Sequence, residues 1–132
     1  MAGKRGDQFE DDETISLETR VLRRIPPGRV VKNNTNLRPQ SDNFSNHPTG
    51  TGTSVSIFVE GSDPLDLLEG HEGFGLVSLT VQDIRDAGLG IIRNPTPDDP
   101  NHAHIQGEKN RRVKRRLAKA ADWIAAPADL EQ

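Results

Sequence analysis

Hydrophobic and polar positions alternate most clearly in the middle of the chain. Residues 53–59 predict a strand, because Val55, Ile57 and Val59 fall on one face and mostly polar residues on the other. Shorter apolar runs, bounded by glycine, proline or polar residues, predict three further strands. These lie at residues 74–79, 89–93 and 102–106.

Polar caps and glycines predict two short helices between these strands. Ser62 or Asp63 can cap the first helix, and Pro64 suits its first turn. Residues 80–83 of the second helix, Thr-Val-Gln-Asp, resemble a capping box with aspartate in place of glutamate. That helix is expected to end at Gly88, the residue type that a left-handed C-cap favours.

A longer helical pattern covers residues 109–126 and stops at Pro127. Its apolar positions recur every three or four residues, as on the buried stripe of a surface helix. They are Val113, Leu117, Ala121 and Ile124. Another face of the helix is basic and holds Arg112, Arg115, Arg116 and Lys119.

The N-terminal part of the chain has weaker patterns. Residues 1–18 are acidic and aperiodic, which predicts a disordered tail. Residues 19–31 predict an extended segment that Pro26-Pro27-Gly28 interrupts, because two prolines exclude a helix there. Residues 33–52 are rich in asparagine, glycine and proline, which predicts a long and therefore functional or disordered loop.

The order of these elements predicts one α+β domain over residues 19–126, followed by a tail at residues 127–132. We expect a small, mostly antiparallel sheet with short helices and a basic C-terminal helix. Composition then excludes several classes of protein. The chain of 132 residues has no cysteine, which removes disulfides, thiol nucleophiles and thiolate metal sites. Its apolar runs are too short to span a membrane and no secretory signal is recognised, so we expect a cytoplasmic protein.

Charge is distributed unevenly although the formal net charge is only -3. Residues 20–38 and residues 109–119 contain basic but no acidic side chains, whereas residues 39–108 are strongly acidic. This asymmetry indicates an anionic or protein partner, or basic segments that pack beside the acidic middle of the same molecule. The basic helix at 109–119 could contact nucleic acid phosphates, although it could equally be a solvated face.

Two histidines are candidates for chemistry. His102 and His104 alternate along a predicted strand, so both imidazoles would point the same way. They could act as a base and its orienting partner, or lie on an exposed strand face. They could also ligate a metal ion together with neighbouring side chains, although no third ligand is fixed by spacing. The side chains considered for that role are Asp98, Asp99, His47 and His71.

The long loop and its flanks carry a second set of candidates. Arginine forks bind phosphates or carboxylates, and serine hydroxyls add short polar contacts, so this region could cradle a nucleotide. The candidates for cofactor binding are Arg23, Arg38 and Ser45. The chain lacks both phosphate-loop fingerprints, and an ordinary connecting loop remains the alternative. The candidate acids are Glu60, Glu69 and Glu72.

The order Arg23-Arg24, Phe44-Ser45 and Ser54-Val55-Ser56 resembles the pattern of ADP-ribosyltransferases. The resemblance implies a split sheet with an NAD-binding cleft. It implies that Arg23 or Arg24 would face the pyrophosphate and that Ser54 or Ser56 would lie near the ribose, with His102 or His104 in the last position. The catalytic set that follows from it is Arg24, Ser54, Ser56, His102 and His104.

The ending His-Ala-x-Ile-x-Gly before a basic helix also resembles short uncharacterised bacterial proteins, a likeness that implies no activity. Three functions therefore remain open. The first is an accessory protein that binds a protein or anionic partner through its basic faces and polar loop. The second is a nucleotide-handling enzyme of ADP-ribosyl type with NAD as cofactor, and the third is nucleic-acid binding through residues 109–119.

Overall fold

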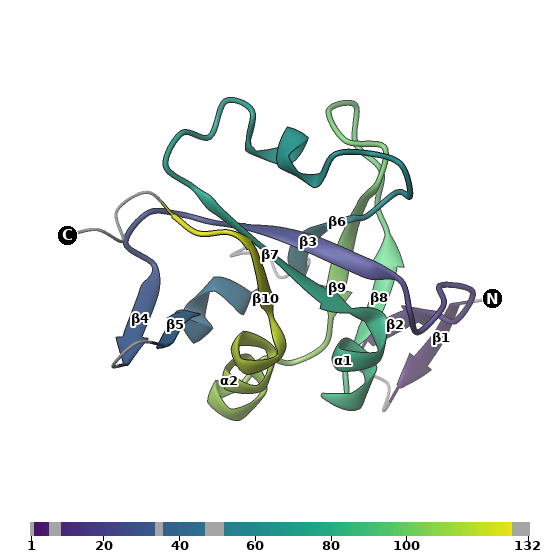
Figure 1. The fold of residues 1–132 in the computed structure, drawn as a ribbon. Helices are drawn as coiled ribbons and strands as arrows, with labels where there is room; N and C mark the ends of the chain where they lie inside the picture. Colours follow the sequence, from purple (N-terminus) through teal and green to yellow (C-terminus); the bar gives the residue numbers. More distant parts are fainter. Residues whose placement is uncertain (1, 6–8, 34–35, 47–51, 128–132) are drawn as a thin grey trace.

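A six-stranded sheet forms the centre of the molecule, seen in a computed structural model that describes residues 2–5, 9–33, 36–46 and 52–127. Every neighbouring pair of strands is antiparallel, in the order β10-β7-β3-β6-β9-β8 (Figure 1). The fold is α+β with a mostly antiparallel sheet and few short helices, which confirms the predicted class. The strands are β3 (Arg20–Ile25), β6 (Thr53–Ile57), β7 (Gly75–Thr80), β8 (Gly90–Arg93), β9 (His102–Gln106) and β10 (Asp122–Ala125).

Among the described residues, two small hairpins and four helical segments surround this sheet. The helices α1 and α2 lie toward one side of it, whereas η2 lies toward the other side (Figure 1). In the part of the chain that the structure describes, no helix is long and apolar enough to cross a bilayer. The elements are β1 (Ala2–Arg5), β2 (Phe9–Asp12), β4 (Val30–Asn33), β5 (Asn36–Pro39), the 3-10 helices η1 (Ser41–Phe44) and η2 (Pro64–Leu68), α1 (Val81–Asp86) and α2 (Arg111–Ala120).

The hydrophobic core lies between one face of the sheet and the helices. Strand residues such as Val21, Leu79 and Ile105 are fully buried in it. Leu117 of α2 and Phe44 of η1 pack into the same cluster. Burial of apolar surface contributes about 25 cal/mol per Å² to the stability of a fold. The packing of these side chains is therefore the main contribution to the stability of this domain.

The predicted caps of the short helices are present. Thr80 and Asp83 form a reciprocal capping box at α1: each side chain accepts from the other's backbone N–H at 3.1 Å. Gly88, two residues beyond α1, has φ +84°, the left-handed conformation that glycine adopts without strain. Asp63 caps the preceding helix with a bond from Leu65 N–H at 3.0 Å, but that helix is the 3-10 element η2.

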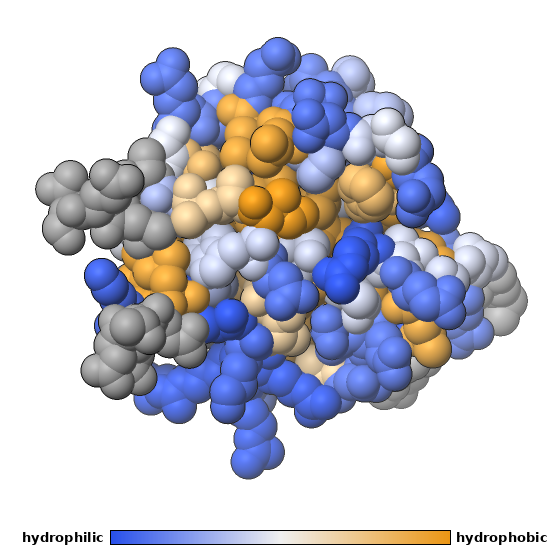
Figure 2. All heavy atoms as spheres, in the orientation of Figure 1, coloured by the Kyte–Doolittle hydropathy of each residue, from blue (hydrophilic) through white to orange (hydrophobic). Residues whose placement is uncertain are grey.

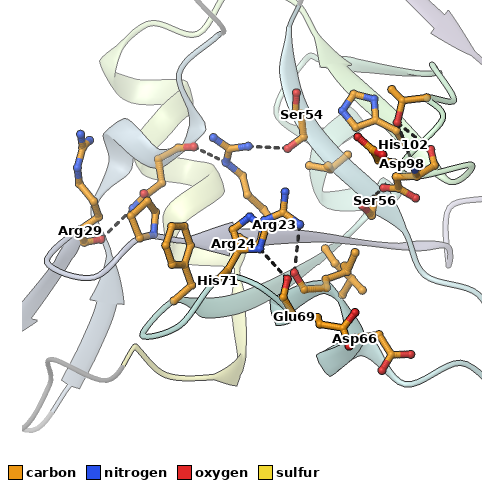
Figure 3. Close-up of a pocket in the computed structure, with 18 of the residues that line it drawn as sticks. Arg23, Arg24, Arg29, Ser54, Ser56, Asp66, Glu69, His71, Asp98 and His102 are labelled. Atoms are coloured by element: carbon orange, nitrogen blue, oxygen red, sulfur yellow. Dashed lines mark hydrogen bonds between the residues drawn. The ribbon is translucent and has the colours of Figure 1, made fainter.

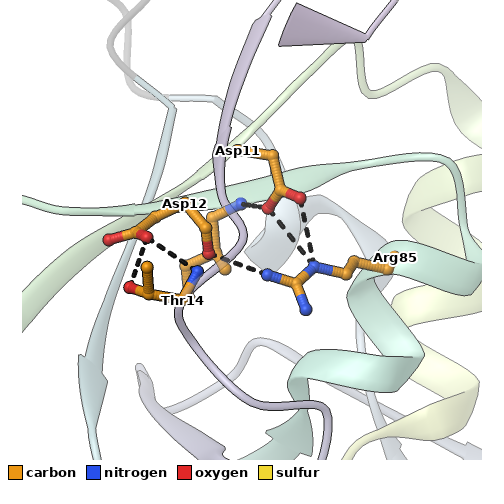
Figure 4. Close-up of polar contacts among 5 residues, drawn as sticks. Asp11, Asp12, Thr14 and Arg85 are labelled. Atoms are coloured by element: carbon orange, nitrogen blue, oxygen red, sulfur yellow. Dashed lines mark hydrogen bonds and ion pairs between the residues drawn. The ribbon is translucent and has the colours of Figure 1, made fainter. Parts of the chain in front are cut away.

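Residues 9–18 do not form the disordered tail that their composition predicts. Asp11 is 1 % exposed and Ile15 belongs to the hydrophobic core. The Asp11 carboxylate accepts from Arg85 Nε at 3.1 Å and from Ile91 N–H at 3.0 Å (Figure 4). Arg85 also donates to the carbonyl of Asp12 at 2.8 Å, so contacts with α1 and β8 hold this acidic segment in place. Residues 1 and 6–8 of the predicted tail lie outside the described residues, as do 128–132 of the C-terminal one.

The predicted helix over residues 109–126 is shorter than its periodicity indicates. It ends at Ala120, and residues 122–125 form β10, which adds to the edge of the sheet beside β7. Arg38 accounts for this end, because its Nη2 donates to the carbonyls of Ala118, Lys119 and Ala121 at 2.6, 2.5 and 2.8 Å. Trp123 then donates from its indole to Leu37 O at 2.9 Å, which fixes β10 in its extended course.

The predicted loop over residues 33–52 also contains ordered structure. Residues 36–39 form β5 and residues 41–44 form η1, whereas residues 47–51 lie outside the described residues. Phe44 is fully buried, and the Asn43 amide donates to the carbonyls of Arg29 and Gln40 at 2.9 and 2.8 Å. One buried aromatic side chain and one bridging amide therefore tie this polar stretch to the domain.

Candidate functional site

The sheet separates between its two central strands. β3 pairs with β7 along all six of its residues, but with β6 only through Val21 and Leu22. A bond from Phe58 N–H to Arg20 O extends this short contact by one step. Beyond Leu22 the two strands have no further paired residues, so the rest of β3 is separated from the start of β6.

The Arg23 side chain spans this separation. Its Nη1 donates to Ser54 O of β6 at 2.5 Å, and its Nε donates to Asn43 O of η1 at 2.5 Å. The guanidinium thus takes the place of the backbone bonds that a continuous ladder would make. Charge-assisted hydrogen bonds to carbonyls contribute about 1.5–3 kcal/mol each to the free energy of unfolding. Arg23 therefore stabilises the contact between β3, β6 and η1.

An open groove of about 1130 Å³ lies over the separation between β3 and β6. Figure 3 shows Arg23 and Arg24 at its centre, with Arg29 toward one end and His102 and Asp98 toward the other. Further walls come from η2 and from the turns beside β7 and β9. The residues from these walls include Asp66, Leu67, Glu69, His71, Phe74, Thr96 and Asp99.

The arginines lie in one part of the groove and Asp98 and Asp99 in another, while Asp66 and Glu69 also line the groove beside Leu67. Arg24 reaches across it and donates to Leu67 O at 3.1 Å, and Arg29 lies beyond Arg23 (Figure 3). At the opposite end Ser56 Oγ donates to a carboxylate oxygen of Asp99, which also accepts from Asn101 N–H at 2.9 Å. Arg23 already donates to Ser54 O and Asn43 O, so Arg24 and Arg29 have the most N–H groups left to donate to an anion. The carboxylate of Asp99 is suited to hydroxyl or amine donors.

His102 has a defined tautomer in this groove. Its Nδ1 lies 2.9 Å from Asn94 O, and because a carbonyl only accepts, Nδ1 carries the proton. In the neutral ring Nε2 is then the hydrogen-bond acceptor. His102 pairs across the sheet with Ser56 and its ring meets the His104 ring edge-on at 4.9 Å. A groove hydroxyl and a basic nitrogen thus lie on adjacent strands.

Lys109, which precedes α2 in the chain, is a second buried cation near Arg23. Lys109 is 9 % exposed, and its Nζ donates to Asn46 Oδ1, Ile105 O and Gly107 O at 2.5, 2.8 and 3.1 Å. Burial, and then the charge of Arg23, lower the pKa of Lys109 to about 8. Burial, and then the charge of Arg24, lower the pKa of Arg23 to about 10. Positive charge is therefore concentrated in this part of the molecule.

The structure brings together part of the predicted site. Arg23, Arg24, Ser54, Ser56 and His102 all line the groove. Three other candidates lie elsewhere. Arg38 caps the end of α2, Ser45 meets Lys114 and Thr53, and His104 contacts Asn94 behind His102.

The remaining predicted positions are dispersed. The four basic residues of α2 that the sequence analysis singles out are exposed on the helix surface and do not line the groove. These are Arg112, Arg115, Arg116 and Lys119. Glu69 lines the groove, whereas Glu60 and Glu72 are exposed outside it. His47 falls outside the described residues, and among those that are described no three His, Asp or Glu side chains group as metal ligands.

One residue that lines the groove and one buried cation near Arg23 are not apparent in the sequence patterns. Arg29 follows the Pro-Pro-Gly turn and reads as a turn residue, yet it lines the groove. Lys109 reads as the start of the basic helix, yet it is buried under Asn46. The only sequence signal for either is that Arg29 continues the basic run begun by Arg23 and Arg24.

Comparisons with protein-family models, with curated proteins and with solved structures each find no match for this chain.

Proposed function

We propose that this chain is a binding protein for an anionic ligand, which the groove receives at its arginine end. One observation carries the proposal. Arg23, Arg24 and Arg29 line the same groove, and among the described residues none of them forms an ion pair. By contrast Lys114, Arg20, Arg85 and Arg93 each lie within ion-pair distance of an aspartate.

Two of the five acidic residues that line the groove support the same division of roles. Asp42 lies near the arginines but is paired with Lys114 at 3.1 Å, and Asp99 is engaged by Ser56 and Asn101. Burial, and then the charge of Arg24, lower the pKa of Arg23, and an anion bound between the two arginines would offset their mutual repulsion. Guanidinium groups bind phosphate or carboxylate with paired hydrogen bonds, which makes either group a suitable ligand.

The test is a calorimetric titration of the full chain with inorganic pyrophosphate at low salt. The variant R24Q/R29Q should weaken pyrophosphate binding at least tenfold. Arg23 is left unchanged because its side chain joins β3 to β6. The matched control is R112Q/R115Q, which removes the same charge from the exposed face of α2. Absence of pyrophosphate binding to the wild type, or equal losses in both variants, would refute the proposal.

A specific observation also supports the second candidate function, the ADP-ribosyl-type enzyme. Arg24, Ser54, Ser56 and His102 line one groove at a split in the sheet, and Asn94 fixes the His102 tautomer. Nicotinamide release from NAD, followed by chromatography, tests this candidate against H102A. A wild-type protein that releases no nicotinamide would exclude it without affecting the binding proposal.

A further inference from the structure

The polar groove continues into a smaller slot beside η2. This slot has a volume of about 150 Å³, and it shares Ser56, Leu67 and Asp99 with the groove. Because these residues line both, the two spaces adjoin one another. The other residues around the slot include Ile57, Phe58, Val59, Ser62, Asp63, Pro64 and Asn101.

The walls of the slot are mostly apolar. Phe58, Val59, Pro64 and Leu67 belong to its apolar part, whereas Asp63, Asp66 and Asp99 are among the polar residues around it. Val59 is 43 % exposed, one of the few large apolar side chains on the described surface that solvent reaches this easily. Hydrophobic surface is visible over η2 in Figure 2 as well. An apolar group bound there would remove this surface from water, at about 25 cal/mol per Å².

The volume of the slot and the side chain of Asn101 restrict the class of ligand that could bind there. A cavity of roughly 150 Å³ holds one six-membered ring, as the binding of benzene to a cavity of that volume shows. Asn101 lies at the slot with its backbone engaged, since its carbonyl accepts from Ile57 N–H at 2.8 Å and its N–H donates to Asp99. Its side-chain amide has no partner among the described residues, and it offers one acceptor and two donors to a ring edge.

We propose that groove and slot together receive a pyrimidine nucleoside phosphate. The phosphate would meet Arg24 and Arg29, the sugar hydroxyls would face Ser56 and Asp99, and the ring would enter the slot beside Asn101. The single ring matches the slot volume, whereas the second ring of a purine would extend beyond it. This inference rests on the proposed function, because it requires the arginine end to bind the phosphate.

Calorimetry on the full chain with UMP, ribose 5-phosphate, uridine and AMP tests the inference. UMP should bind at least tenfold more tightly than ribose 5-phosphate, uridine should bind weakly, and AMP should bind less tightly than UMP. R24Q should weaken both phosphates. Equal affinity for UMP and ribose 5-phosphate would overturn the ring site while leaving the anion site intact, and AMP binding more tightly than UMP would overturn the size assignment. If neither phosphate binds although inorganic pyrophosphate does, the nucleoside phosphate is refuted and the anion site stands; if pyrophosphate does not bind either, the proposed function fails as well.

Two slot variants separate ring binding from general effects. V59F places an extra ring in the slot and N101A removes the free amide, so both should lower UMP affinity toward that of ribose 5-phosphate without changing the latter. The matched control is V31F, because Val31 is 50 % exposed on β4 and lines neither space. If circular dichroism shows that V59F does not fold, the UMP affinity of N101A alone tests the ring site. Unchanged UMP affinity in a folded slot variant would refute the inference.

Discussion

Replacing Asp11 by alanine tests how strongly the N-terminal segment is bound to the domain. The substitution leaves the Arg85 guanidinium, whose side chain is 12 % exposed, without its carboxylate, and leaves Ile91 N–H without its acceptor. Removing one partner of a buried ion pair costs about 3–5 kcal/mol. This is a large part of the roughly 5–15 kcal/mol that stabilises a typical domain, so D11A should be close to unfolding.

Urea denaturation followed by circular dichroism measures this loss. With an m-value of about 1.5 kcal/mol/M, a loss of about 4 kcal/mol lowers the midpoint by roughly 2.5 M. The control is D122A, which removes the exposed Arg20–Asp122 pair, whose side chains are 46 % and 70 % exposed. An exposed pair contributes about 0–1 kcal/mol, so the control should shift little.

A double-mutant cycle identifies the source of the effect. D11A/R85A should be less destabilised than the sum of its two single variants, with a coupling of about 0.5–3 kcal/mol. If D11A unfolds at the same urea concentration as D122A, the contacts of Asp11 do not stabilise the domain and the N-terminal segment is not part of its cooperative unit. Additive losses in the cycle would instead place the effect of Asp11 outside its ion pair.

Two other predictions concern the cations outside the groove. The pKa of Lys109 falls from 10.5 to about 8 on folding, so between these values the unfolded chain binds the extra proton. Stability should therefore rise as the pH increases from about 8 to 10.5, and chemical denaturation of K109Q should lack this rise. The exposed basic face of α2 predicts binding to single- or double-stranded nucleic acid that weakens steeply with salt and is lost in R112Q/R115Q/R116Q/K119Q. Fluorescence anisotropy that detects no nucleic-acid binding at low salt, or binding that salt does not change, would contradict the prediction for α2.

Local patterns predict the elements whose stabilising contacts are close in sequence. The capping box of Thr80 and Asp83 needs contacts only three residues apart, and it forms as expected. The shared face of Ser54, Ser56 and His102 follows from the two-residue period of a strand. Their antiparallel register, with Ser56 opposite His102, then brings the hydroxyl and imidazole into one groove.

Contacts between distant residues explain what the sequence patterns miss. Asp11 meets Arg85 across 74 positions, so nothing local marks the acidic start of the chain as part of the core. Arg38 ends α2 through carbonyls that are 80 to 83 positions away, which overrides a helical periodicity that continues to residue 126. The same arginine fork that resembles a phosphate ligand in the sequence thus serves as a helix cap.

The narrow joint between β3 and β6 has a mechanical consequence. It divides the sheet into two three-stranded halves, β10-β7-β3 and β6-β9-β8, which are held together by a few backbone bonds and one guanidinium. Each half is internally rigid because its own ladders are longer. We therefore expect rotation of one half against the other to be the softest deformation of the sheet, and such a rotation would alter the spacing between Arg24 on one half and His102 on the other. A molecule seated across the joint would suppress that rotation, so occupancy of the groove would stiffen the whole sheet.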